Sequence, residues 1–153
     1  MTETGPPVHV LVVDDQAPFR RAARAVVSAT SGFELVGEAL SGEEAVELVR
    51  SLEPDLVLLD IHMPGIGGIG AARRIEAAGN NAVTVLLSSY QEEDLPEGAK
   101  SCGAAAYVHK EDFGPRVLRA LWRGGTNLTP RRGREAPPSP GGAPSPPTKG
   151  RAW

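Results

Sequence analysis

The sequence predicts an α/β fold, in which a five-stranded, doubly wound parallel sheet carries helices on both faces. Short apolar runs rich in β-branched residues alternate along the chain with longer segments whose apolar residues recur at helical spacing. The runs are apolar along most of their length, which is typical of parallel strands buried on both faces. Most of them stop at a polar residue, and parallel sheets of this kind bind their ligands at the carboxyl ends of the strands.

Five runs are predicted to be strands. They cover residues 8–13, 34–37, 56–59, 83–87 and 104–109. A helix is expected after each strand, around residues 19–27, 42–52, 69–75, 93–102 and 113–122. A regular alternation of strand and helix is the pattern of a parallel sheet covered on both sides.

Local signals indicate where several helices begin and end. Ser41 and Glu44 have the spacing of a capping box, so the second helix should begin at this point. Pro96 must lie in the first turn of the helix near 93–102 or shorten that helix, since proline has no backbone N–H to donate. Gly124 and Gly125 should end the last helix.

Charge and composition divide the chain into two parts. Residues 1–124 have a net charge of −7, which argues against nucleic acid as the main partner. Residues 125–153 have a net charge of +4 and contain seven prolines and five glycines, so they cannot bury enough apolar surface to offset the entropy of ordering. We therefore expect a folded domain at 1–124 and a disordered Pro/Gly/Arg-rich tail at 125–153.

The composition also bears on where the protein works. No apolar run approaches the ~20 residues of a membrane span, and no signal peptide is evident, so no membrane partner is expected. Cys102 is the only cysteine, which excludes an intrachain disulfide and favours the cytoplasm.

Polar side chains follow the ends of four predicted strands. Asp14 and Asp15 follow the first strand, Asp60 the third, Ser88 the fourth and Lys110 the fifth. If the first and third strands are neighbours, the three carboxylates converge, and two charges ~4 Å apart repel by roughly 4 kcal/mol at an effective dielectric near 20. Hard oxygen ligands at this density suit Mg²⁺. A carboxylate nucleophile, a metal, a hydroxyl and an ammonium together fit phosphoryl transfer to an aspartate.

These motifs resemble a response-regulator receiver domain. The resemblance covers residues 8–123 in the family's order and spacing. It rests on Val10-Leu11-Val12-Val13-Asp14-Asp15, on Asp60-Ile61-His62-Met63-Pro64-Gly65, on Ser88, and on Gly103-Ala104 through Tyr107 to Lys110. It implies a flavodoxin-like strand order of 2-1-3-4-5.

The resemblance implies a metal site built from four residues. Asp60 would be the phosphoacceptor and also a ligand of Mg²⁺. Asp15 would ligate the metal directly, and Asp14 would assist. The backbone carbonyl of His62 would complete the protein's share of the metal shell. No other cofactor is expected.

The resemblance also implies a phosphoryl site and a switch. Ser88 would contact the phosphoryl group, and Lys110 would pair with it. Tyr107 matches the aromatic residue that moves inward when the site is phosphorylated, so Ser88 and Tyr107 would form the switch. The family usually has proline after the lysine, whereas Glu111 stands there in this chain.

The function implied is that of a two-component response regulator. It would accept a phosphoryl group from a sensor histidine kinase or a phosphotransfer protein and signal to a downstream protein partner. It would catalyse only its own phosphorylation and dephosphorylation, and it could form a homodimer. No helical periodicity follows residue 125, so no DNA-binding domain is expected.

Other functions remain open on the sequence alone. The fold could be an interaction module that needs no phosphate, although the set of Asp60, Ser88 and Lys110 argues against it. An aspartate-based, Mg²⁺-dependent phosphohydrolase is a weaker alternative, because Asp14-Asp15 lacks the Asp-x-Asp spacing of that class. The glycine run at 65–70 satisfies G-x-G-x-x-G, but it does not open directly from a strand, so a dinucleotide site is disfavoured.

Overall fold

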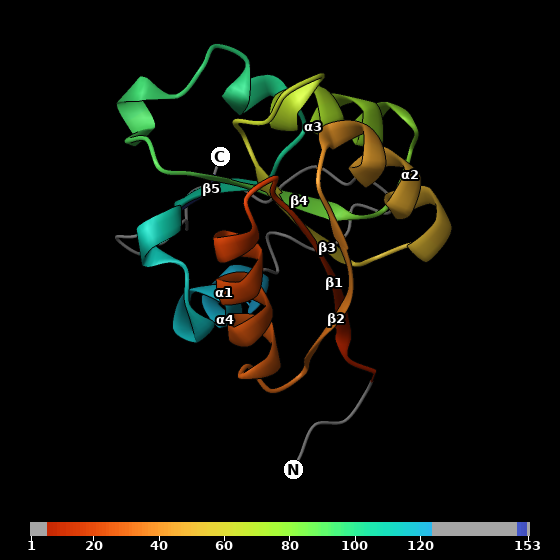
Figure 1. The fold of residues 1–153 in the computed structure, drawn as a ribbon, viewed down its shortest axis with the longest axis vertical. Helices are drawn as coiled ribbons and strands as arrows, with labels where there is room; N and C mark the ends of the chain where they lie inside the picture. Colours follow the sequence, from red (N-terminus) through yellow and green to blue (C-terminus); the bar gives the residue numbers. More distant parts are fainter. Residues whose placement is uncertain (1–5, 124–149, 153) are drawn as a thin grey trace, which may run out of the picture.

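A central sheet separates two layers of helices in the computed structural model, which describes residues 6–123 and 150–152 (Figure 1). The described residues form six strands: β1 (Val8–Val13), β2 (Phe33–Ala39), β3 (Leu56–Asp60), β4 (Val83–Ser88), β5 (Ala106–His109) and β6 (Gly150–Ala152). Their order is β2-β1-β3-β4-β5-β6, and the first five strands run parallel. The predicted order of five parallel strands is therefore confirmed. It places β1 beside β3, where the chain changes direction across the sheet.

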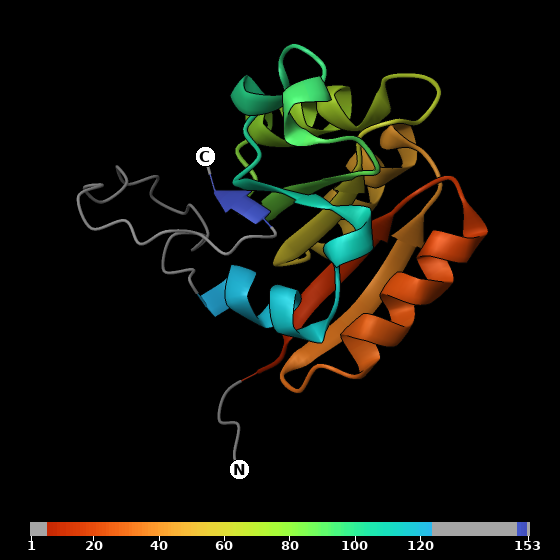
Figure 2. The same cartoon turned by 90° about the vertical axis from the view of Figure 1, so that its left-hand side faces the viewer.

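Within the described residues, four α-helices cover the sheet: α1 (Ala17–Ser28), α2 (Gly42–Leu52), α3 (Gly67–Ala77) and α4 (Pro115–Arg123). Helices α1 and α4 lie on one face, and α2 and α3 lie on the other (Figures 1 and 2). Side chains alternate along each strand, so Val10 and Val12 pack toward α1 and α4, whereas Leu11 and Val13 pack toward α2 and α3. Every helix among the described residues is too short or too polar to span a bilayer.

The capping box begins α2 as predicted, with one difference. The Ser41 hydroxyl accepts a hydrogen bond from the Glu44 backbone N–H at 3.0 Å. The Glu44 carboxylate accepts one from the backbone N–H of Leu40, at 2.8 Å, instead of from Ser41. Both bonds satisfy backbone donors at the point where the chain turns from β2 into the helix.

The glycine run brings α3 against the end of β3. Gly65 and Gly67 have positive φ angles of 78° and 70°, in the left-handed region that favours glycine. A Cβ atom at Gly68 would lie 2.1 Å from the carbonyl oxygen of Asp60. The positive φ angles of Gly65 and Gly67 and the close approach at Gly68, which lies between the glycines of the G-x-G-x-x-G pattern, give this run a structural role at the end of β3.

The helix predicted near 93–102 is not an α-helix. Two short 3₁₀ helices stand there, η1 (Glu92–Asp94) and η2 (Ala99–Ser101). Pro96 removes a backbone donor, and Gly98 has a φ of 94°, so the chain cannot continue as one helix between them. Ala99 and Cys102 are nevertheless buried against the same face of the sheet as α2 and α3.

Two predicted strands differ from the structure by two residues at one end, and two others extend one residue further than predicted, to Asp60 and to Ser88. The strand predicted at 34–37 extends over Phe33–Ala39, because residues on both sides of a bulge at Val36 pair with β1. The strand predicted at 104–109 begins at Ala106.

A sixth strand lies within the segment for which the sequence predicts disorder. Residues 150–152 pair antiparallel with β5, beside which Figure 2 shows them as a short blue arrow. Pairing of this kind uses backbone groups, which any edge strand offers, so the tail's composition does not reveal it. The rest of the predicted tail, 125–149 and 153, lies outside the described residues. The boundary near 124 stays a prediction.

Candidate functional site

Three carboxylates meet at the carboxyl ends of β1 and β3. Asp14 and Asp15 follow β1, and Asp60 is the last residue of β3. One oxygen from each lies within 4.8 Å of the others. They converge because β1 and β3 are paired in register, with Val13 opposite Leu59. Asp14 and Asp60 are buried, and Asp15 is exposed at the rim.

The ammonium of Lys110 bridges the two buried carboxylates. Its Nζ atom lies 2.6 Å from Oδ2 of Asp14 and 3.2 Å from Oδ1 of Asp60. Lys110 follows β5 directly, at the start of the 3₁₀ helix η3 (Lys110–Asp112). Its Nζ also lies 4.7 Å from the centroid of the Phe19 ring on α1, which favours the cation further.

The surroundings of Asp60 oppose its negative charge. Burial, and next the negative charge of Asp14, raise the pKa of Asp60 from 3.8 to about 6. The Lys110 ammonium and a backbone hydrogen bond from His62 lower that pKa without cancelling the rise. Burial works against the charge of Lys110, but the carboxylates of Asp14 and Asp60 outweigh it and raise the pKa of the amine. Lys110 is therefore a cation at neutral pH.

The carboxylate cluster fits a divalent cation. Three carboxylates and one ammonium leave two negative charges uncompensated within it. Oδ1 of Asp14 accepts a hydrogen bond from the Gln16 backbone at 2.8 Å. Oδ2 of Asp14 is buried and has no hydrogen bond of regular geometry, although it contacts Lys110 as an ion pair. Carboxylate oxygens from three residues, all within 4.8 Å of one another, are the kind of donor set that Mg²⁺ prefers.

A cavity of about 170 Å³ opens beside Asp60. It is lined by Gln16, Asp60, His62, Ser89, Tyr90 and Lys110. Gln16 is not among the site residues predicted from the sequence. Its position directly after the Asp14-Asp15 pair could have placed it at the same edge of the sheet. The cavity gives a donor molecule access to the carboxylate of Asp60 and to the ammonium of Lys110.

The hydroxyl of Ser88 is engaged in a backbone contact. Ser88 is fully buried at the end of β4, and its Oγ accepts a hydrogen bond from the Tyr90 N–H at 2.9 Å. The neighbouring Ser89 lines the cavity instead. The structure therefore brings together Asp14, Asp15, Asp60 and Lys110, and the contact of Ser88 with a phosphoryl group stays a prediction.

Tyr107 is connected to the cavity through Tyr90. Its ring is 4% exposed and packs on the face covered by α2 and α3. Its hydroxyl donates a hydrogen bond to the backbone carbonyl of Tyr90. The Tyr90 ring stacks on His62, with the ring centroids 4.4 Å apart. Two contacts, from Tyr107 to Tyr90 and from Tyr90 to His62, thus join the buried face of the sheet to the cavity.

Comparison with known proteins identifies the family. The response regulator receiver domain model matches residues 10–122, and the chain belongs to this family. It is 36% identical over 114 residues to the response regulator UvrY of Escherichia coli K12, a match that covers 74% of this chain and 52% of UvrY. The chain spans about half the length of the curated relatives of this kind that it matches.

Solved structures agree with this assignment. The signal receiver domain of the response regulator NarL from Mycobacterium tuberculosis superposes with a TM-score of 0.74 at 29% identity, covering 80% of this chain and 98% of that one. The CheX–CheY–BeF₃–Mg²⁺ complex from Borrelia burgdorferi gives a TM-score of 0.70 at 29% identity, covering 78% and 90%. Receiver domains bind Mg²⁺ at an aspartate cluster, and Asp14, Asp15 and Asp60 form such a cluster here.

Proposed function

We propose that Asp60 is the residue of this receiver that accepts the phosphoryl group. The observation that carries the proposal is the position of the Lys110 ammonium, within 3.2 Å of both buried carboxylates and at the wall of the cavity. A cation at that point can pair with a phosphoryl oxygen as soon as a donor enters. Asp60 is the carboxylate that both touches Lys110 and lines the cavity.

The transfer follows from this arrangement. An oxygen of the Asp60 carboxylate attacks the phosphorus atom of the donor, a new O–P bond forms, and the bond from phosphorus to the leaving group breaks with its electron pair going to that group. The Lys110 ammonium would then pair with a negatively charged oxygen of the transferred phosphoryl group. Ser88 would donate its hydroxyl hydrogen to another of these oxygens.

The metal belongs to the same proposal. Asp14, Asp15, Asp60 and the backbone carbonyl of His62 would hold Mg²⁺. When bound, the ion neutralises negative charge on the phosphoryl oxygens. The excess of two negative charges and the convergence of the three carboxylates, with one oxygen of each within 4.8 Å of the others, support this assignment.

The partners and the location are proposed from the family. A sensor histidine kinase or a phosphotransfer protein would supply the phosphoryl group in the cytoplasm. The phosphorylated domain would then act on a downstream protein, as a monomer or as a homodimer. The domain would catalyse only its own phosphorylation and dephosphorylation.

The experiment is intact-protein mass spectrometry after incubation with acetyl phosphate and Mg²⁺. The wild type should gain one phosphoryl unit, and Asp60→Asn should gain none. Asp94→Asn is the matched control, because Asp94 is exposed in η1 and away from the cavity lining, and it should be labelled like the wild type. Labelling of Asp60→Asn to the wild-type extent would reject the assignment.

A further inference from the structure

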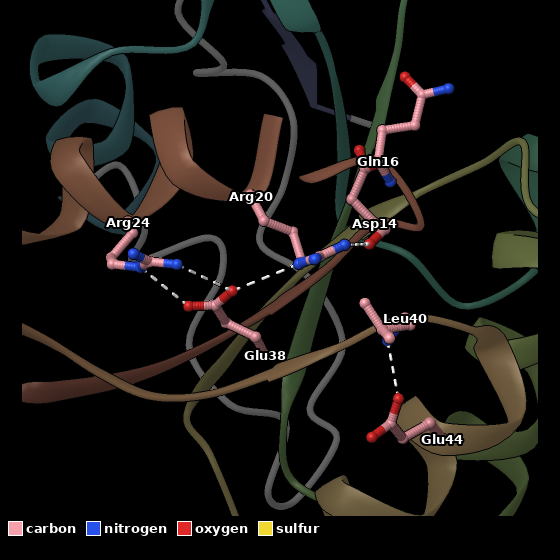
Figure 3. Close-up of polar contacts among 7 residues, drawn as sticks. All are labelled: Asp14, Gln16, Arg20, Arg24, Glu38, Leu40 and Glu44. Carbon is pink, nitrogen blue, oxygen red and sulfur yellow. Dashed lines mark hydrogen bonds and ion pairs between the residues drawn. The ribbon is translucent and has the colours of Figure 1, made fainter. Parts of the chain in front are cut away.

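The loop that carries Asp14 and Asp15 is held from outside the carboxylate cluster by Arg20 of α1. The Arg20 Nη1 donates a hydrogen bond to the backbone carbonyl of Asp14 at 2.9 Å. Its Nε lies 3.4 Å from Oε1 of Glu38 on β2. Figure 3 shows the Arg20 guanidinium lying between Glu38 and Asp14. The side chain is only 18% exposed, so the contact is largely shielded from water.

The contact fixes the peptide that joins the two carboxylate residues. A trans peptide is planar, and its C=O and N–H groups point in opposite directions. Holding the carbonyl of Asp14 therefore sets the orientation of the Asp14–Asp15 peptide as a whole. Asp15 is exposed, so side-chain packing does little to orient it. The guanidinium contact thus constrains a residue that packing leaves free.

Arg24 offers an internal comparison. It lies one turn further along α1 and binds the same Glu38 carboxylate, with its Nε 3.0 Å from Oε2. Its contacts drawn in Figure 3 lead to Glu38 and not to the loop. Arg20 and Arg24 therefore share a charge and a partner, and differ in the bond to the Asp14 carbonyl.

We propose that Arg20 is a positioning residue for the metal site: through the Asp14 carbonyl it holds Asp14 and Asp15 in the arrangement that binds Mg²⁺. This inference rests on the proposed function. Removing a group that orients a metal ligand from behind typically weakens metal binding by about 10–100-fold.

The positive charge of Arg20, taken alone, would have the opposite effect on Mg²⁺ binding from the proposed positioning role. A guanidinium near the site repels a divalent cation, so its removal should strengthen Mg²⁺ binding if electrostatics were its only effect. Loss of positioning should weaken that binding. The sign of the change therefore separates the two roles, and Arg24→Gln reports the effect of charge without the loop contact.

The experiment is calorimetric titration of the metal-free protein with MgCl₂ at constant ionic strength. Arg20→Gln should weaken Mg²⁺ binding by about tenfold, whereas Arg24→Gln should leave it unchanged or strengthen it. In phosphorylation by acetyl phosphate, Arg20→Gln should raise the Mg²⁺ concentration needed for half the maximal rate and restore the wild-type rate at saturating Mg²⁺. Far-UV circular dichroism of the metal-free Arg20→Gln variant should match that of the wild type, because Mg²⁺ that binds only the folded state would also rescue a merely destabilised fold.

Two results would overturn the inference. The first is an Arg20→Gln variant that binds Mg²⁺ as tightly as Arg24→Gln. If Arg20→Gln does not fold, Arg20→Lys decides, because its ammonium keeps the charge but cannot hold the two contacts of the guanidinium. The second overturning result is therefore wild-type affinity in Arg20→Lys. A wild type that itself shows no Mg²⁺ binding would instead reject the proposed function.

Discussion

Asp60 combines two properties that ordinary surface carboxylates lack. It is almost fully buried, and it faces a second buried carboxylate, Asp14, across a single shared ammonium. Burial and repulsion both oppose ionisation, so the metal-free fold holds a carboxylate that gains from any added positive charge. The burial and repulsion that destabilise the metal-free fold therefore also favour the binding of Mg²⁺ and the approach of an electrophilic phosphorus atom to Asp60.

The raised pKa of Asp60 predicts how the stability of the metal-free protein depends on pH. Between 3.8, its ordinary value, and about 6, the folded state binds more protons than the unfolded state. The free energy of unfolding contributed by Asp60 therefore falls as the pH rises through this window and stays low above it. Asp60→Asn removes the charge, so it should stabilise the protein at pH 8, by on the order of 1–3 kcal/mol.

The measurement is urea unfolding in EDTA at pH 5 and pH 8. The advantage of Asp60→Asn over the wild type should be larger at pH 8 than at pH 5. Asp94→Asn, an exposed carboxylate, should follow the wild type at both values. An advantage that is equal at the two pH values would show that charge on Asp60 is not its source.

At the scale of elements, the site depends on how closely α3 approaches the end of β3. Gly68 is buried in the first turn of α3, and its backbone N–H donates a hydrogen bond to the carbonyl of Ile61 at 3.1 Å. The glycine run thus tethers the loop after Asp60 to the helix that follows it. In the sequence these glycines suggest a nucleotide site, because close backbone approach to a phosphate and to another backbone call for the same residue.

Gly68→Ala should therefore destabilise the protein by more than about 2 kcal/mol. The added Cβ would lie 2.1 Å from the Asp60 carbonyl oxygen, a backbone atom that cannot move without shifting β3 or α3. Gly114→Ala is the matched control, because nothing lies within 4 Å of a Cβ there. Its stability should change by less than about 0.5 kcal/mol. Urea unfolding at pH 7 measures both, and equal effects would contradict the packing argument.

At the scale of the whole molecule, the sheet and the main site could be predicted because both depend on patterns that are local in sequence. Apolar runs ending in Asp60 or Lys110 report strands and their carboxyl ends, and the family resemblance supplies the strand order. What escaped prediction depends on contacts between distant segments. The bond of Arg20 to the Asp14 loop needs α1 packed beside β2, and β6 needs a free edge at β5.

The segment from Ser88 to Lys110 differs most from its prediction, and it also joins the site to the rest of the domain. The Ser88 hydroxyl accepts a hydrogen bond from the Tyr90 N–H, and the Tyr107 hydroxyl donates one to the Tyr90 carbonyl. Tyr90 also lines the cavity. Two short 3₁₀ helices replace a continuous α-helix here, so fewer regular backbone hydrogen bonds resist a rearrangement.

This segment should therefore respond most strongly to a phosphoryl mimic. A phosphoryl group that draws the Ser88 hydroxyl toward the cavity must release the Tyr90 N–H, and movement of Tyr90 then disturbs its bond to Tyr107. The effect can arise only through contacts that differ between the two states. With beryllofluoride and Mg²⁺, backbone amide shifts should concentrate at 88–110. Tyr107→Phe, which lacks the hydroxyl, should keep the shifts near Ser88 and reduce those at 104–110. Shifts spread evenly over the domain, or unchanged in Tyr107→Phe, would refute this route.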